Sequence, residues 1–155
     1  MIEPPRILTT EAVETAVIRM KIPRSEIQAV MGPAIGEVMR AVAAQGIGPA
    51  GPLFSYHFRM TPETFDFEVG VPVTRPVTPA GRVVPSKLPA VTVARGVYQG
   101  PYEGLGEAWG AFKKEVAAGG HAEREDLWEC YLAGPESGPD PAMFRTELNQ
   151  PLVSG

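Results

Sequence analysis

The feature that most constrains the fold of this 155-residue chain is an internal repeat. The matching pairs, in chain order, are Gly32-Pro33 with Gly100-Pro101, 36–42 with 106–112, Leu53-Phe54 with Leu127-Trp128, and Glu68-Val69 with Glu147-Leu148. The identities are sparse, but they occur in the same order across three predicted elements. Chance similarity between short segments is the alternative. A repeat of this length predicts one supersecondary unit that occurs twice.

The periodicity of apolar residues assigns the same elements to each half. In the first half, strands are expected at 15–22, 53–60 and 65–73, with a short turn at 25–31 and a helix from Pro33 to Gln45 that Gly46 ends. In the second half, strands are expected at 90–98, 126–132 and 143–148, with a helix at 103–118. We therefore predict an α+β fold of tandem duplicated β-α-β-β units, with antiparallel sheets, one helix per unit, a pseudo-twofold and a ligand cleft between units.

The predicted domain organisation follows from these elements. Residues 1–155 form a single domain, with the first repeat at 12–73, a linker with at most a short extended piece at 74–89, and the second repeat at 90–152.

Alternation along the strands predicts which side chains share a face. We expect the apolar set to lie under the helices: Phe54, Tyr56 and Phe58, then Phe67, Val69 and Val71, then Trp128, Cys130 and Leu132. The opposite faces then carry the polar set, which includes Ser55, His57, Glu68, Glu129, Tyr131 and Glu147. Between two units these faces form an acidic and aromatic cleft, which suits a cationic ligand.

Composition excludes several other classes of function. The net charge is −4 with no basic cluster, so direct nucleic-acid binding is not expected. A single cysteine and two isolated histidines, His57 and His121, cannot build a metal site, and we expect no cofactor. No apolar run is long enough to span a membrane, and the N-terminus lacks the pattern of a signal peptide, so a cytoplasmic protein is predicted.

Glu129 is the strongest candidate site residue, because it interrupts the apolar and aromatic stretch 126–132. Its counterpart in the first repeat is Ser55, whereas Glu147 has an acidic counterpart in Glu68. Because only the second repeat has an acid at this place, Glu129 has the character of a site residue more than of a residue that the fold requires. Glu68 and Glu147 fit equally well on the solvated side of edge strands, and a lone histidine such as His57 is more often structural than catalytic.

The same residues resemble motifs of the GyrI-like (gyrase-inhibitor-like) small-molecule-binding domains. The resemblance rests on 99–107, on Trp128-Glu-Cys-Tyr-Leu132, on Pro139-Asp-Pro-Ala142 with Arg145-Thr-Glu147 and Pro151-Leu152, and on Phe67-Glu-Val-Gly-Val-Pro-Val73. It implies the duplicated β-α-β-β fold, a central pocket for lipophilic, often cationic compounds, and a buried acid in the Trp-Glu-x-Tyr strand, which here is Glu129. Larger relatives carry this domain behind a DNA-binding helix-turn-helix, for which the two repeats leave no room here.

Three functions are compatible with this resemblance. The first is a stand-alone protein that binds lipophilic or cationic compounds for xenobiotic sensing or resistance, with ligand contacts from Glu129, Tyr131, Glu147, His57, Ser55 and Glu68. The second is a hydrolase that opens strained cyclopropane rings of genotoxic natural products, with Glu129 and Tyr131 as catalytic residues. The third is a gyrase-modulating inhibitor. A protein partner and a homodimer both stay open.

Overall fold

The structure is a computed structural model that describes residues 3–60, 63–133 and 140–153. It divides into two compact units: the first unit is Glu11–Ala90, and the second unit is Val91–Gly155 together with Met1–Thr10. Residues 61–62, between the predicted strands 53–60 and 65–73, and residues 134–139, between the predicted strands 126–132 and 143–148, lie outside the described residues. Within the described residues, no helix is long and apolar enough to cross a membrane.

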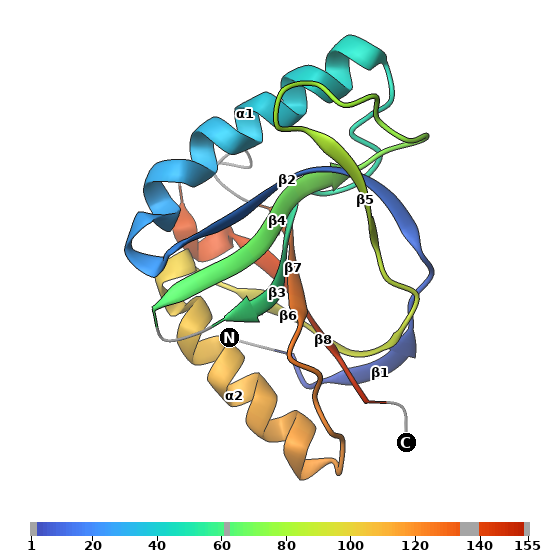
Figure 1. Ribbon diagram of the computed structural model, residues 1–155. Coiled ribbons are helices and arrows are strands. Elements are labelled where there is room, and N and C mark those ends of the chain that lie inside the picture. The colour runs from blue at the N-terminus through green and yellow to red at the C-terminus, as the bar shows by residue number, and fades with distance from the viewer. Residues whose placement is uncertain (1–2, 61–62, 134–139, 154–155) are drawn as a thin grey trace. The chain divides into compact units, whose positions relative to one another are not determined.

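The first unit is an antiparallel sheet with one helix. Its elements are β2 (Val13–Pro23), a 3-10 turn (Arg24–Glu26), α1 (Ile27–Gln45), β3 (Phe54–Met60), β4 (Thr64–Pro72) and β5 (Val84–Leu88). The strands pair in the order β3-β4-β2-β5. The helix α1 packs on β2 and β4 (Figure 1), and the core between them includes Ile18, Val38 and Val69.

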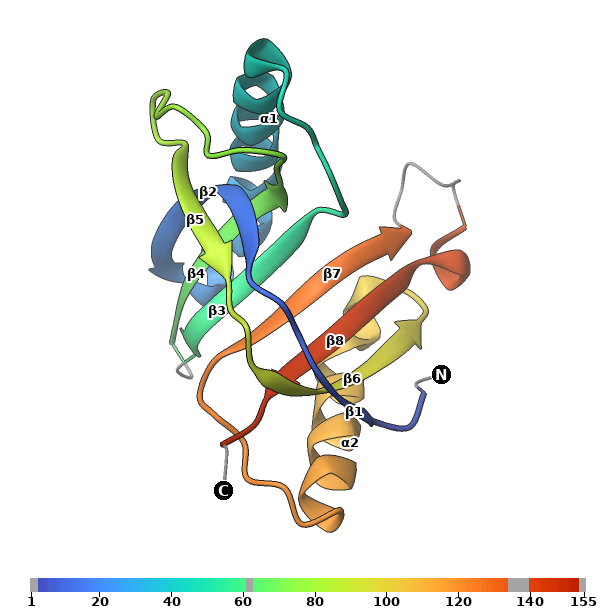
Figure 2. The ribbon, with the colours of Figure 1, turned by 90° about the vertical axis from the view of Figure 1, so that its right-hand side faces the viewer.

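The second unit is also an antiparallel sheet with one helix. Its elements are β1 (Arg6–Thr9), β6 (Thr92–Gln99), a 3-10 turn (Tyr102–Gly104), α2 (Leu105–Ala118), β7 (Leu127–Ala133), a 3-10 turn (Pro141–Met143) and β8 (Arg145–Pro151). The strands pair antiparallel in the order β1-β6-β8-β7. The helix α2 crosses this sheet (Figure 2), and Trp109, Phe112 and Leu148 belong to the core beneath it.

The predicted α+β class with antiparallel strands is confirmed, and the order β-α-β-β occurs in each unit. The duplication itself and the cleft between units stay predictions. The strand β1 was not expected, because Pro4 and Pro5 precede it and only four residues pair. Such short strands next to prolines are typical of sheet edges.

The helix α1 is longer than the sequence predicted. It runs without interruption from Ile27 to Gln45, with Pro33 inside it, so the predicted break at Gly32-Pro33 is wrong. An internal proline costs about 3 kcal/mol of helix stability, but packing against the sheet contributes more, since Ala34, Val38 and Val42 are fully buried. The predicted end is confirmed: Gly46 has φ 64°, the left-handed conformation that favours glycine.

The predicted facing is correct for β4 but reversed for β3 and β7. On β4, Phe67 and Val69 lie in the core beneath α1. Ser55 and His57 of β3 pair directly with them, so these polar residues, and not Phe54 and Tyr56, face α1. The alternation gave the correct pairs of faces, but it could not show which face the helix covers, because both faces are buried there.

In the second unit, the strand whose faces are reversed is β7, which carries the candidate acid Glu129. Leu127 lies in the core beneath α2, and Glu129 bonds to Trp109 of that helix, so Leu127, Glu129 and Tyr131 share the side facing α2. Trp128 and Cys130 are buried on the other face, and Leu132 is exposed. The carboxylate therefore lies under the helix, and the prediction that Trp128 and Cys130 lie there is wrong.

Close approach of strands in the first unit predicts the effect of a single methyl group. A Cβ at Gly70 would lie 2.1 Å from the carbonyl oxygen of Ala16, whereas a Cβ at Gly110 in α2 would meet nothing within 4 Å. We expect Gly70→Ala to lower the free energy of unfolding by at least about 2 kcal/mol, and Gly110→Ala to raise it by roughly 0.5–1 kcal/mol. Urea unfolding of both variants measures this, and a Gly70→Ala variant as stable as wild type would contradict it.

Candidate functional site

The site is built around Glu129, a carboxylate buried between α2 and β7. Its residue is 9% exposed. The indole of Trp109 donates a hydrogen bond from Nε1 to Oε2 over 2.6 Å, and the hydroxyl of Tyr131 donates to Oε1 over 2.9 Å. Trp109 comes from the buried face of α2, and Tyr131 lies two residues along β7 on the same side. Each carboxylate oxygen thus receives one neutral donor.

Charge balance distinguishes Glu129 from an ordinary buried acid. In the part of the chain that the structure describes, no cationic side chain lies within ion-pair distance of it. Burial raises the pKa of Glu129 above its usual value, and the hydrogen bonds from Trp109 and Tyr131 only partly oppose this. A carboxylate buried in this way is either protonated, or ionised and paired with a cation from outside the described residues.

Aromatic rings continue from the carboxylate toward the surface. Tyr131 meets Tyr102 edge to face with ring centroids 5.9 Å apart, and Tyr102 lies 5.0 Å from the ring of Phe144. Tyr102 is 37% exposed, so this aromatic row leads from the buried acid to solvent. Ring faces attract cations and bury apolar groups, which gives the row the chemistry of a site for an aromatic or lipophilic cation.

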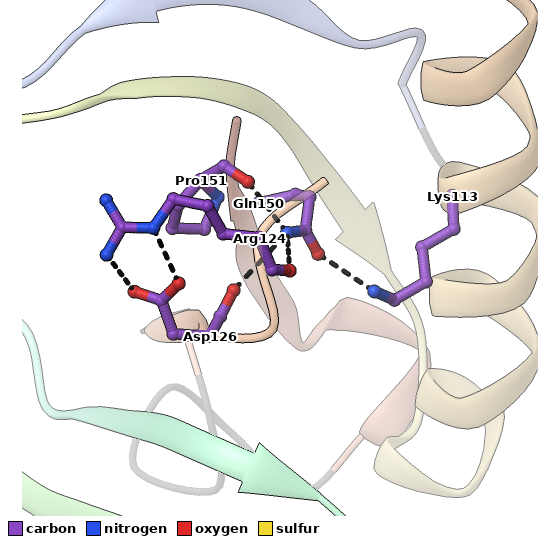
Figure 3. A network of polar contacts seen from close by, with 5 residues as sticks. All are labelled: Lys113, Arg124, Asp126, Gln150 and Pro151. Carbon is purple, nitrogen blue, oxygen red and sulfur yellow. Dashed lines mark hydrogen bonds and ion pairs between the residues drawn. The ribbon is translucent and has the colours of Figure 1, made fainter. Parts of the chain in front are cut away.

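A polar network fixes the elements that carry the site. Figure 3 shows Gln150 of β8, fully buried, whose Nε2 donates to the carbonyl oxygens of Arg124, Asp126 and Pro151 at 3.0, 3.3 and 2.9 Å. Its Oε1 accepts from Lys113 of α2 at 2.9 Å. The start of β7 is thereby attached to both β8 and the helix, which sets the position of Glu129 along its strand.

Glu147, the predicted second acid, is on the other face of the second unit. Its carboxylate lies 3.4 Å from Arg95 and accepts from the amide of Asn149 at 3.1 Å, while Arg95 donates to Asn149 over 2.7 Å. Because Arg95 compensates its charge, Glu147 has the character of a structural ion pair. The structure therefore brings Glu129 and Tyr131 together but places Glu147 away from them.

The predicted residues of the first unit are also divided between two faces. Ser55 and His57 face α1, where His57 stacks on Phe67 with ring centroids 5.0 Å apart. Burial lowers the pKa of His57 to about 4, and its Nδ1 has no hydrogen-bond partner among the described residues. Glu68 is on the opposite face, where Ser86 of β5 donates to its carboxylate at 2.9 Å.

The described residues contain no candidate metal site, because no three His, Cys, Asp or Glu side chains lie close enough together to hold a metal ion. The sequence analysis did not identify Trp109 and Tyr102 as site residues. A signal did exist: a buried indole N–H needs an acceptor, and Glu129 is an acid without a basic neighbour in the stretch 126–132. Finding the pair required knowing that β7 turns Glu129 toward α2.

Comparison with known proteins gives a family and a set of similar folds. The model of the family "GyrI-like small molecule binding domain" matches residues 3–152. No curated protein matches. The C-terminal domain of EcmrR is similar in structure, with a TM-score of 0.83 and 20% identity over 97% of this chain and 98% of that domain. The longer EcmrR chain in a DNA complex has the same TM-score at 19% identity, and this chain spans 58% of its length.

Two further solved structures are more distant in sequence. The structure of SAV2435 bound to tetraphenylphosphonium has a TM-score of 0.65 and 9% identity, over 98% of this chain and 95% of that one. A hydrolase from Listeria innocua has a TM-score of 0.63 and 12% identity, over 97% of this chain and 92% of that one. At these identities the similarity concerns the fold.

The raised pKa of Glu129 predicts a pH dependence of stability. An acid whose pKa is higher in the folded state binds more protons there, so its stabilising contribution is complete below the unfolded pKa near 4.5 and is lost as pH rises through the folded pKa. Relative to Glu129→Gln, wild type should lose up to about 1.4 kcal/mol per pH unit in that window. Urea unfolding of both proteins between pH 4 and pH 8 measures the difference, and parallel stability curves would contradict it.

Proposed function

Because this chain belongs to the family of GyrI-like small-molecule-binding domains, we propose that it binds lipophilic cations with Glu129 as their charge anchor. The observation that carries the proposal is the carboxylate buried beneath α2 with neutral donors and no cationic partner among the described residues. A bound cation supplies the missing charge. Such binding serves the sensing of xenobiotics or resistance to them.

The surroundings of Glu129 support an organic cation rather than a metal ion. Trp109 and Tyr131 hold the carboxylate oxygens, and the rings of Tyr131, Tyr102 and Phe144 extend outward. Aromatic rings favour cations whose charge is spread over a large apolar body, because such cations lose little hydration on binding. SAV2435, a neighbour in fold, was solved with a cation of this kind, tetraphenylphosphonium.

The proposal predicts binding of tetraphenylphosphonium that depends on the charge of Glu129. We expect wild type to bind it at least about tenfold more tightly than Glu129→Gln does, which corresponds to about 1.4 kcal/mol. The neutral compound triphenylphosphine oxide should bind both proteins equally. The control variant Glu147→Gln removes the same charge from an acid that Arg95 already compensates, and it should bind like wild type. Isothermal titration calorimetry measures all of these affinities.

The pH dependence of this affinity has a fixed sign. Below the pKa of Glu129 in the free protein, the carboxyl must release its proton before the cation binds, so affinity rises about tenfold per pH unit and then levels off. The affinity of Glu129→Gln should not change over the same range. A flat profile for wild type, or equal affinities of wild type and Glu129→Gln, would exclude Glu129 as the anchor.

A second candidate, favoured by the hydrogen bond between Tyr131 and Glu129, is a hydrolase for strained cyclopropane rings. Burial raises the pKa of Glu129 toward the range where a carboxylate acts as a general base. Glu129 would take a proton from water while the water oxygen bonds to a ring carbon. The ring C–C bond breaks, and its electron pair passes to a conjugated carbonyl. Once Glu129 holds the proton, the single O–H of Tyr131 would turn from Glu129 and donate to that oxygen.

Catalytic turnover distinguishes a hydrolase from a protein that only binds its ligand. With an activated cyclopropane in excess, an enzyme should form many equivalents of ring-opened product per protein, and Glu129→Gln and Tyr131→Phe should each slow it by 10²-fold or more. Mass spectrometry of the product over time makes the measurement. A stoichiometric complex without released product would exclude catalysis on that substrate.

A further inference from the structure

Lys113 occupies an unusual place one helical turn after Trp109. Its ammonium nitrogen lies 5.8 Å from the centroid of the Trp109 ring, within the range of a cation–π contact. The same indole donates its N–H to the carboxylate of Glu129 at 2.6 Å. A cation, an aromatic ring and a buried acid therefore follow one another in a row, and the cation does not touch the acid.

The position of the ammonium is fixed from the other side. Lys113 donates to Oε1 of Gln150 at 2.9 Å and lies 3.4 Å from the carboxylate of Glu123. Gln150 cannot move freely, because it is fully buried and its amide also bonds the backbone carbonyls around the start of β7 and the end of β8 (Figure 3). A long lysine side chain is normally mobile, so these contacts hold the ammonium at a defined place beside the Trp109 ring.

The physical consequence concerns the strength of the indole as a donor. A cation at the face of an indole draws electron density from the ring and makes the N–H more acidic. A stronger donor favours the ionised form of the carboxyl that accepts from it. We propose that Lys113 is a positioning residue for Glu129: held by Gln150, its ammonium acts through the ring of Trp109 to support the charged carboxylate that anchors the ligand.

The other described groups around Glu129 and Lys113 do not supply the positive charge that Lys113 places beside the Trp109 ring. Glu129 meets Trp109 of α2 and the neutral hydroxyl of Tyr131 on β7, and its direct neighbour on β8 is the apolar Leu148. Lys113 meets Glu123 and Gln150. The side chains of Lys113 and Glu123 are 35% and 29% exposed, so solvent weakens the effect. We expect it to amount to about half a pH unit in the ionisation of Glu129.

Loss of Lys113 should change cation binding in the direction opposite to that expected from simple charge repulsion. Removing a cation near a cation-binding site should tighten binding, but loss of Lys113 should weaken it wherever Glu129 is partly protonated. One pH unit below the midpoint, the affinity for tetraphenylphosphonium should fall about threefold, and the plateau at high pH should not fall. A purely structural role of Lys113 would lower the plateau as well. This readout rests on the proposed function.

A second readout needs no ligand. The indole N–H proton of Trp109 senses the ionisation of Glu129, so its NMR signal should titrate with pH, and Trp128→Phe assigns the two indole signals. The variants are Lys113→Met and Lys113→Gln, which remove the charge, and Lys113→Arg, which keeps it. Lys114→Met is the matched control, because Lys114 is the next residue of α2 and is exposed.

In Lys113→Met and Lys113→Gln, the midpoint of this titration should rise by about half a pH unit. In Lys113→Arg and Lys114→Met it should stay at the wild-type value. An unchanged midpoint in both neutral Lys113 variants, with the protein folded, would overturn the inference while leaving the proposed binding of cations intact. Wild type that titrates as expected but does not bind tetraphenylphosphonium would instead overturn the proposed function alone.

Discussion

The burial of one carboxylate without a cation is the constraint on which the second unit depends. Removing a charged carboxylate from water costs several kcal/mol unless partners replace its hydration. Among the described residues, Trp109 and Tyr131 are its neutral donors and no cationic side chain pairs with it, so the acid is accommodated but its charge is not balanced there. A fold selected for stability alone would place an apolar residue or an ion pair there. The arrangement therefore costs stability that a bound cation can return.

This constraint explains why the surrounding elements are fixed so firmly. A donor is useful only at hydrogen-bond distance, and Trp109 lies on a helix that could slide by a fraction of an ångström. The contacts of Gln150 with Lys113 and with the backbone near Arg124 and Asp126 attach helix and strand to each other. The salt link of Arg124 with Asp126, at 2.9 Å, stiffens the same turn. Preorganisation of this kind lowers the entropy lost when a ligand binds.

The order of elements was predictable from the sequence, because it depends on local signals. Apolar periodicity gave α2, and Gly46 gave the end of α1. Which face of β7 turns toward α2 was not predictable. Trp128 and Cys130 were expected on that face because they are apolar, but side chains on both faces are buried at the start of β7, so hydrophobicity did not distinguish the two faces. The helix break predicted at Pro33 was wrong for a related reason, since tertiary packing outweighed the low helix propensity of proline. Glu129 was identified correctly as a buried acid in the strand, but its partner Trp109 was a tertiary contact.

The two units differ in what they bury beneath the helix. In the predicted repeat, Ser55 and His57 are the counterparts of Glu129 and Tyr131; both lie beneath α1, and burial lowers the pKa of His57 to about 4, so it is neutral. At these two positions the first unit packs β3 against its helix with uncharged side chains. A unit of this kind can therefore bury the strand against its helix without an acid, which supports the proposed role of Glu129 in holding a cation. A cation is the partner that both its missing countercharge and its aromatic neighbours favour.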